Sequence, residues 1–106
     1  MRARGEVPDA GAPLMRALLA DAAAAGCTAR AVSASARDWA SATFVGAQHR
    51  IVLAVAGAGA DDWVRQLPEA DLPVWRHVVA DLTVDAVAME EGERRVTIAA
   101  LVLLAA

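Results

Sequence analysis

The chain contains no lysine, one cysteine and only two histidines among its 106 residues. Its positive charge comes from 10 scattered arginines, of which Arg94 and Arg95 are the one adjacent pair, and the formal net charge is −3. A nucleic-acid surface needs a stripe of Lys and Arg that displaces counterions from phosphates, and a polybasic membrane segment needs a similar cluster. The sequence therefore predicts neither a nucleic-acid partner nor an electrostatic membrane anchor.

Cys27 is the only cysteine, which excludes an intrachain disulfide and makes a reducing, cytoplasmic setting the expectation. The run Ala24-Ala25-Gly26-Cys27 resembles a bacterial lipoprotein cleavage site. However, Arg16 and Asp21 interrupt the continuous apolar run that such a leader requires. We therefore expect Cys27 to be a small buried thiol that carries no lipid.

Long apolar runs are also missing. The longest covers residues 98–106, far short of the ~20 apolar residues of a membrane-spanning helix, so we expect no membrane span. No internal repeat is visible, and the length fits one domain. Residues 1–11 lack periodicity and are expected to form a flexible tail before a single domain over 12–106. Abundant alanine, with 28 residues, and the absence of lysine suggest a high-GC bacterial genome.

The apolar pattern predicts a single α+β domain with the order α-β-β-β-α-β-β. An Ala-rich 3.6-residue period, begun by Pro13 and stopped by Gly26, predicts a long helix over 13–25. The remaining elements are strands at 29–37, 39–45 and 49–56, a short helix at 60–67, and strands at 74–89 and 94–104. Hairpin turns are expected at Gly46-Ala47 and at 90–92. We expect a mostly antiparallel sheet with the long N-terminal helix packed on one face.

Two of these strands are apolar on both faces. The strand 49–56 has no polar face after Arg50, and in 94–104 the residues Ala99, Leu101 and Leu103 alternate with Val96, Ile98 and Val102. An antiparallel strand with one solvated face alternates apolar and polar residues, so this sheet is predicted to be covered on both sides. Helix 13–25 can cover one face, and a partner subunit is the simplest cover for the other. We therefore predict a homodimer packed through its sheets. The alternative is a monomer whose two helices cover opposite faces.

Residues 38–49 form the densest run of unusual side chains. If the turn at Gly46-Ala47 has even length, four residues share one face and offer an aromatic ring and two hydroxyls to a ligand: Trp39, Ser41, Thr43 and Arg50. A turn of odd length would instead bury Trp39 in the core. In the plainer reading, Trp39 and Phe44 are core or interface residues and the hydroxyls only favour a strand.

The sequence offers little evidence for a catalytic site. A triad could combine Ser41, His49 and Asp38, or Cys27 with His49. Ser41 lacks the Gly-x-Ser-x-Gly elbow that exposes a nucleophile, and Cys27 follows a helix C-terminus, where the helix dipole disfavours a thiolate. The sequence therefore predicts no catalytic residues.

Metal and cofactor signals are weak as well. His77, Asp81 and Asp85 share one face of the expected strand 74–89, but a spacing of four residues separates neighbours by ~13 Å. The run Gly57-Ala58-Gly59 follows a strand and opens a helix, as a dinucleotide loop does, but Asp61 and Asp62 would repel a pyrophosphate. We expect no metal and no cofactor.

Three function classes remain, of which the favoured one is a non-catalytic, homodimeric protein-interaction module. The second is a small-molecule binding protein that uses a helix–sheet cavity or the Trp39/Ser41/Thr43 face. The third is an enzyme that uses Asp38, His49, His77 or Asp81. The candidate ligand or interface residues are Trp39, Ser41, Thr43, His49, Leu101 and Leu103.

Over residues 13–104 the expected element order resembles that of type III secretion chaperones, which are small acidic dimers with the order α-β-β-β-α-β-β-α. No motif supports this likeness and the final helix is missing here, so it implies a chaperone-like dimer as an alternative and carries over no residues. The order over 13–67 is also similar to that of double-stranded RNA binding domains. Those domains need a basic start to their second helix, where this chain has Asp61 and Asp62.

Overall fold

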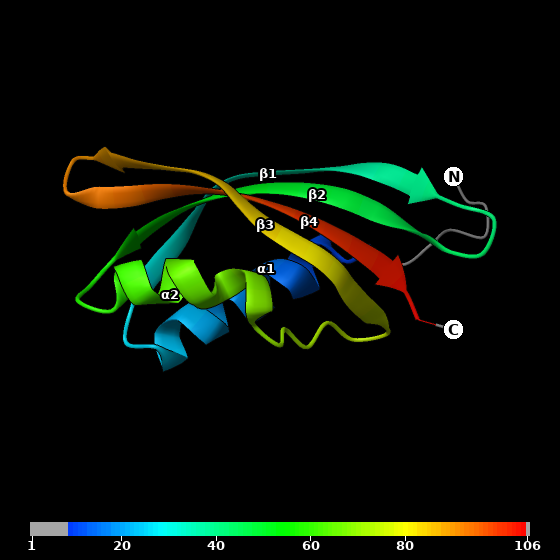
Figure 1. Cartoon of the computed structure of the whole chain (residues 1–106), viewed down its shortest axis with the longest axis horizontal. Helices are drawn as coiled ribbons and strands as arrows, with labels where there is room; N and C mark the ends of the chain where they lie inside the picture. Colours follow the sequence, from blue (N-terminus) through cyan, green and yellow to red (C-terminus); the bar gives the residue numbers. More distant parts are fainter. Residues whose placement is uncertain (1–8, 106) are drawn as a thin grey trace.

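The computed structural model of the chain describes residues 9–105. In chain order the elements are α1 (Gly11–Ala24), β1 (Thr28–Ala40), β2 (Val45–Ala56), α2 (Ala60–Gln66), the 3₁₀ turn η1 (Leu67–Glu69), β3 (His77–Glu90) and β4 (Glu93–Leu104). The four strands form one antiparallel sheet in the order β1-β2-β4-β3. The predicted α+β class, the antiparallel sheet and the N-terminal helix on one face are confirmed (Figure 1).

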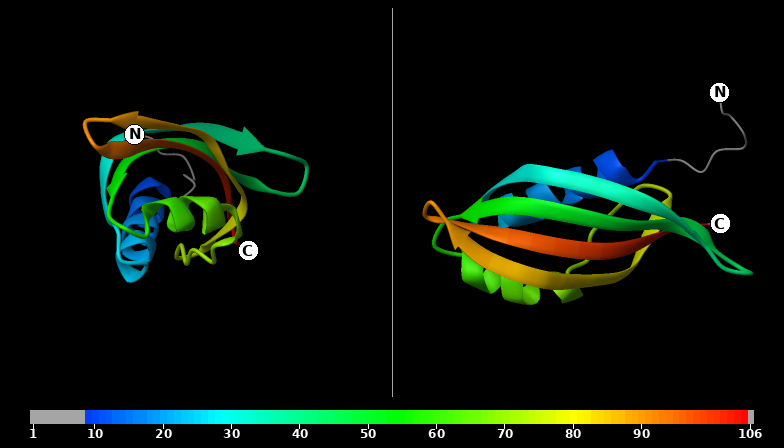
Figure 2. Two further views of the ribbon diagram at one scale, coloured as in Figure 1. Left: turned by 60° about the vertical axis from the view of Figure 1, so that its left-hand side comes forward. Right: turned by 90° about the horizontal axis from the view of Figure 1, so that it is seen from above.

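Both helices lie against the same face of the sheet, which curls over them (Figure 2). The core between them includes Leu14 and Leu18 of α1, Trp63 of α2, and Ile51 and Ile98 of the central strands. We call the sheet surface that meets the helices the inner face. The alternative in which the two helices cover opposite faces is excluded by this arrangement.

The sheet has one strand fewer than expected because the first hairpin turns earlier in the chain. β1 runs unbroken to Ala40, and the turn forms at 41–44, where the Ser41 backbone N–H donates to the Phe44 carbonyl at 2.8 Å. The Ser41 hydroxyl accepts the backbone N–H groups of Thr43 at 3.4 Å and Phe44 at 3.1 Å. The turn predicted at Gly46-Ala47 is therefore wrong, since both residues lie within β2. A serine can close a turn through its own side chain even among residues that favour strands.

α1 attaches to the sheet through a stripe of buried residues four apart, Leu14, Leu18 and Ala22. The helix ends at Ala24, and the chain turns away at Gly26, which has a φ of 82°. The N–H of Gly26 donates to Ala23 at 3.0 Å and the N–H of Cys27 to Ala22 at 2.9 Å, the bonding pattern of a Schellman motif. This motif turns the chain so that Cys27 enters the core, which confirms a buried thiol.

α2 packs beside α1 through a specific polar contact. Trp63 is 5% exposed, and its indole Nε1–H donates to the Asp21 carboxylate of α1 at 2.8 Å. A buried indole needs such a partner for its N–H. The bond therefore holds the two helices together on the inner face.

Two bulges in β3 change the faces of its residues. Its pairing with β4 shifts register between Val79 and Asp81 and again between Val84 and Ala86. Each bulge adds one residue and so reverses the alternation of side chains. The expected common face of His77, Asp81 and Asp85 is therefore wrong. His77 precedes the first bulge and lies on the inner face. Asp81 follows the bulge and lies on the opposite face, away from the helices.

The second hairpin forms where the sequence predicts it. Glu91 and Gly92, at its tip, have φ values of 53° and 82°. Two successive positive φ angles are the mark of a type I′ turn, which matches the twist of the flanking strands.

Residues 1–8 of the expected tail lie outside the described residues. Within the described part, Ala10 is buried and Gly11 begins α1. Among residues 9–105, no helix combines the length and the apolar character needed to cross a membrane.

Gly46 is a position in the sheet that cannot accept a side chain. A Cβ at Gly46 would lie 2.1 Å from the Val102 carbonyl oxygen and 2.9 Å from the Leu103 Cα, which are backbone atoms of β4. We expect Gly46→Ala to lower the free energy of unfolding by about 2 kcal/mol, measured by urea denaturation, because β2 and β4 must separate. Gly11→Ala is the control, since its Cβ would meet only the Asp9 side chain, at 3.2 Å. Equal stability of the two variants would contradict this expectation.

Candidate functional site

The surface of the sheet turned away from both helices is the first candidate site, and we call it the open face. On β2 and β4, Ile51 pairs with Ile98 and both are buried against the helices. The residues between such buried positions therefore point to the opposite side. Strand register arranges the central open face in three rows, which run from β1 through β2 and β4 to β3: Trp39, Gly46, Leu103, Val78; Arg37, Gln48, Leu101, Asp81; and Ser35, Arg50, Ala99, Thr83.

The first row is an apolar surface without a cover in the described chain. Val78 is 54% exposed and Trp39 is 36% exposed, at opposite edges of the sheet. Leu103 lies between them and is half-buried, as is Leu101 in the next row. Neither helix reaches this side (Figure 2).

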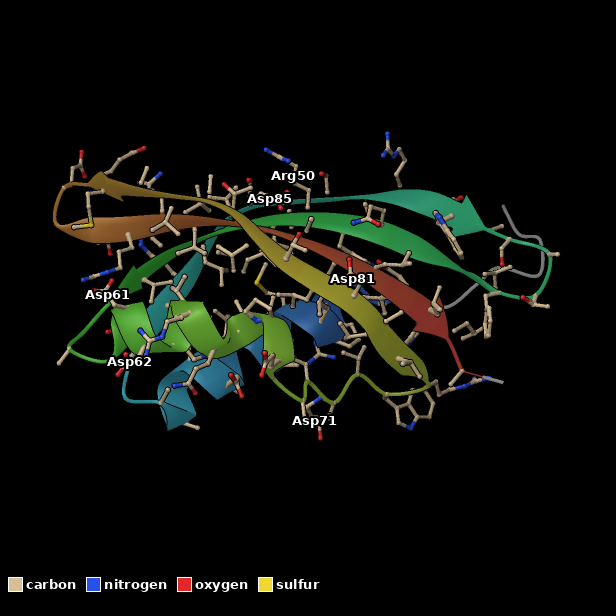
Figure 3. The ribbon with its side chains drawn as sticks, in the orientation of Figure 1. Arg50, Asp61, Asp62, Asp71, Asp81 and Asp85 are labelled. Carbon is tan, nitrogen blue, oxygen red and sulfur yellow. The ribbon has the colours of Figure 1, made fainter. Side chains whose placement is uncertain are left out.

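The open face is also polarised across the strands. Arg37 and Arg50 come from β1 and β2, whereas Asp81 and Asp85 come from β3. Arg50 and Asp85 project from the side opposite the helices (Figure 3), and the Asp85 carboxylate accepts a hydrogen bond from the Thr83 hydroxyl at 2.8 Å. The β1–β2 side of the face is therefore cationic and the β3 edge is anionic.

Ion pairs occupy the end of the open face near the β3–β4 turn. Arg30 contacts Glu93 at 2.8 Å, and Arg95 lies 3.6 Å from Glu90. Ala54, in the row between the two arginines, is 1% exposed. On the open face, the uncovered row of large apolar side chains therefore lies at the other end, near the β1–β2 turn.

Trp75 adds a further exposed ring near the edge of β3. It is 78% exposed, and the Arg76 guanidinium lies 5.4 Å from its ring centroid. Trp75 and Val78 both line a hollow of about 370 Å³. Neither residue stands out in the sequence, since Trp75 lies in a loop and the bulge in β3 decides the direction of Val78.

The candidate residues from the sequence divide among three places. Trp39, Leu101 and Leu103 come together on the open face, and Arg50 shares that face with Trp39. Ser41 and Thr43 lie in the β1–β2 turn, so they do not form a strand face with Trp39. His49 lies on the inner face and is 3% exposed.

A second candidate is a cavity of about 180 Å³ between the start of α1 and the inner face. Among the described residues, its polar lining comes from four separate parts of the chain: Asp9 before α1, Asp38 on β1, His49 on β2 and His77 on β3. Both histidines of the protein therefore reach one cavity together with two carboxylates.

His49 is the buried group of this cavity. Its Nε2 has no hydrogen-bond partner among the described residues. Burial lowers the pKa of His49 below its ordinary value, and the charge of His77 acts in the same direction, whereas the Asp9 carboxylate raises it. His77 lies differently, with its Nδ1 at 2.8 Å from the Trp75 carbonyl oxygen.

The other motifs have structural roles in the described chain. Asp61, at the start of α2, forms a bidentate ion pair with Arg94 of β4, in which Arg94 donates a hydrogen bond to each carboxylate oxygen. These hydrogen bonds lower the pKa of the Asp61 carboxyl. The glycine-rich loop before it therefore begins a short helix that is tied to the sheet. Within residues 9–105, no group of three or more His, Cys, Asp or Glu side chains is placed to hold a metal ion.

Comparison with known proteins gives no relative: no family model, no curated protein and no solved structure matches the chain. The observed order α-β-β-α-β-β also lacks a strand on which the likeness to secretion chaperones rests. The fold and its surfaces define a class only: a small α+β domain whose helices cover one face of a four-stranded sheet.

The lowered pKa of His49 predicts that stability depends on pH. The unfolded chain takes up this proton near the ordinary value of 6.5, whereas the folded chain does so only at lower pH. The unfolded state then binds more protons, so the free energy of unfolding is highest above pH 6.5 and falls as the pH drops below it. We expect the free energy of unfolding, measured by urea denaturation, to fall between about pH 7.5 and about pH 5.5. This fall should be smaller for His49→Gln than for the wild type. Identical losses would contradict the assignment.

Proposed function

We propose that the protein is a non-catalytic homodimeric interaction module whose two copies pack through their open faces. The observation that carries the proposal is the uncovered row of Trp39, Leu103 and Val78, opposite a face that already holds both helices. Removing such apolar area from water is favourable, and contiguous apolar patches on soluble proteins commonly mark interfaces.

The rows are complementary to themselves under a two-fold rotation. Rotation about an axis parallel to the strands places β1 of one copy over β3 of the other, and β2 over β4. Each row then meets itself in reverse order, and two packed sheets keep their strand directions within about 30°. This is an isologous contact, the arrangement expected of a homodimer.

In the apolar row this rotation joins side chains of matching shape. Trp39 lies over the partner's Val78, and Leu103 lies over the partner's Gly46. Gly46 projects no side chain from the open face, so the leucine meets backbone at this position. Large residues therefore oppose small ones, as close packing requires.

In the charged row the same rotation joins opposite charges. Arg37 lies over the partner's Asp81, and the pair occurs twice because of the symmetry. Among residues 9–105, neither side chain has a hydrogen bond or ion pair within its own chain, so both are available. Opposed charges at an interface select the orientation of the partners and disfavour alternatives.

The curvature of the sheet fits this arrangement. Since the sheet curls over its helices, two open faces approach most closely along the central strands β2 and β4 (Figure 2). The central residues Gly46 and Ala99 are small, whereas the edge strand β1 carries the long Arg37 and Trp39. Three or four rows of a four-stranded sheet present about 500 Å² per copy, near the low end for specific contacts, so we expect a reversible dimer.

The structure also bears on the other functions expected from the sequence. A catalytic role has little support, because Cys27 is buried in the core and the Ser41 hydroxyl accepts backbone N–H groups in its turn. The lone Cys27 and the composition support a bacterial, cytoplasmic protein. The Trp39/Ser41/Thr43 alternative is weakened by the position of the turn, whereas the helix–sheet cavity keeps small-molecule binding open on the inner side.

Two valines of β3 provide a matched test of the dimer. Val78 is 54% exposed on the open face, and Val87 is 50% exposed at a position that pairs with buried Val96 of the inner face. We expect sedimentation velocity over a concentration series to show a reversible wild-type dimer. Val78→Asp should raise its dissociation constant at least about tenfold, because a carboxylate would enter an apolar contact.

Val87→Asp is the control and should leave the dissociation constant unchanged. Circular dichroism of both variants checks that the fold is retained. A wild-type protein that stays monomeric throughout the series, or variants that behave alike, would overturn the proposed dimer.

A further inference from the structure

The cavity on the inner face has an electrostatic character of its own, separate from the open face. Its lining combines the carboxylates of Asp9 and Asp38 with the imidazoles of His49 and His77, and no arginine of the described residues takes part. Asp9 is held in place by the N–H of Gly11, which donates to one carboxylate oxygen at 2.8 Å. Asp38 has no hydrogen bond or ion pair within the described chain. The cavity therefore presents two carboxylates with no arginine of residues 9–105 in its lining.

A buried histidine lines the same cavity. His49 lines it, is 3% exposed, and leaves its Nε2 without a hydrogen-bond partner in residues 9–105. Buried polar atoms of native proteins normally have a partner, so an unmatched one needs an explanation. A neutral imidazole can accept a hydrogen bond through one ring nitrogen, and burial favours the neutral form of His49 by lowering its pKa.

We infer that this cavity binds a small organic cation, an alkylammonium or guanidinium compound, whose N–H groups donate to His49 Nε2 and to the carboxylates of Asp38 and Asp9. An ammonium or guanidinium group supplies several donors and a positive charge. Ala36, Ala47 and Val102 form apolar walls that can contact a short alkyl part.

The geometry disfavours other ligand classes. An anion would be repelled by the two carboxylates, and a metal ion lacks a group of three ligands in the described chain. The volume of about 180 Å³ lies below the ~300–1,000 Å³ of pockets for drug-sized ligands, so the cation has only a few heavy atoms. The site does not depend on the proposed dimer, because Asp38 and His49 lie on the inner side of the sheet.

The test is a titration of the full chain with methylguanidinium chloride and ethylammonium chloride, against sodium chloride at matched ionic strength. NMR of the His49 ring reports binding. We expect at least one of the two cations to shift the His49 resonances saturably and to lower the pH at which His49 takes up its proton. Asp38→Asn should weaken that binding at least about tenfold, since it removes a charged acceptor.

Asp71→Asn is the matched control, because Asp71 is an exposed carboxylate in the loop after η1, outside the lining of this cavity (Figure 3). It should bind the cation as the wild type does, and so should Val78→Asp, which separates this site from the dimer. The inference is overturned if neither cation gives a saturable shift, or if Asp38→Asn binds as tightly as the wild type. Saturable binding of Zn²⁺ at His49 in place of the organic cations would also overturn it.

Discussion

The structure depends on the packing of both helices against a single face of the sheet. Leu14 and Leu18 of α1 fill the space under the central strands, and the Trp63–Asp21 hydrogen bond ties α2 to α1 on the same side. Because both helices lie on the inner face, nothing in the described chain covers the opposite face. The apolar residues on that face then have no partner within one copy, and this constraint leads to the proposed dimer.

The two faces of the sheet carry different chemistry as a consequence. The inner face is closed by the core except near the start of α1, where His49 reaches a small cavity with Asp9 and Asp38. The open face has leucines in its centre and opposite charges on its edge strands, Arg37 on β1 and Asp81 on β3. Strand alternation produces this division, because neighbouring residues such as Gln48 and His49 point to opposite sides.

The sequence predicts the class of fold well, since the helix stop at Gly26, the turn at Gly92 and the two-faced apolar pattern of β4 are local signals. It misplaces the first hairpin because the Ser41 side chain closes a turn among strand-forming residues. The first bulge of β3 is invisible in the alternation, so the sequence places His77 and Asp81 on one face although they lie on opposite faces. The cavity is missed for another reason: Asp9 and His49 are far apart in the chain and meet only through the packing of α1.

The most direct test of the two-fold contact exchanges the charges of its polar row. Arg37→Asp places like charges across the interface in a homodimer, and so does Asp81→Arg, so each variant alone should dimerise at least about tenfold more weakly than the wild type. In an equimolar mixture both contacts become attractive again, and sedimentation velocity should show that the mixture recovers a dimer close to the wild-type strength. A mixture that associates no better than its separate components would contradict the account.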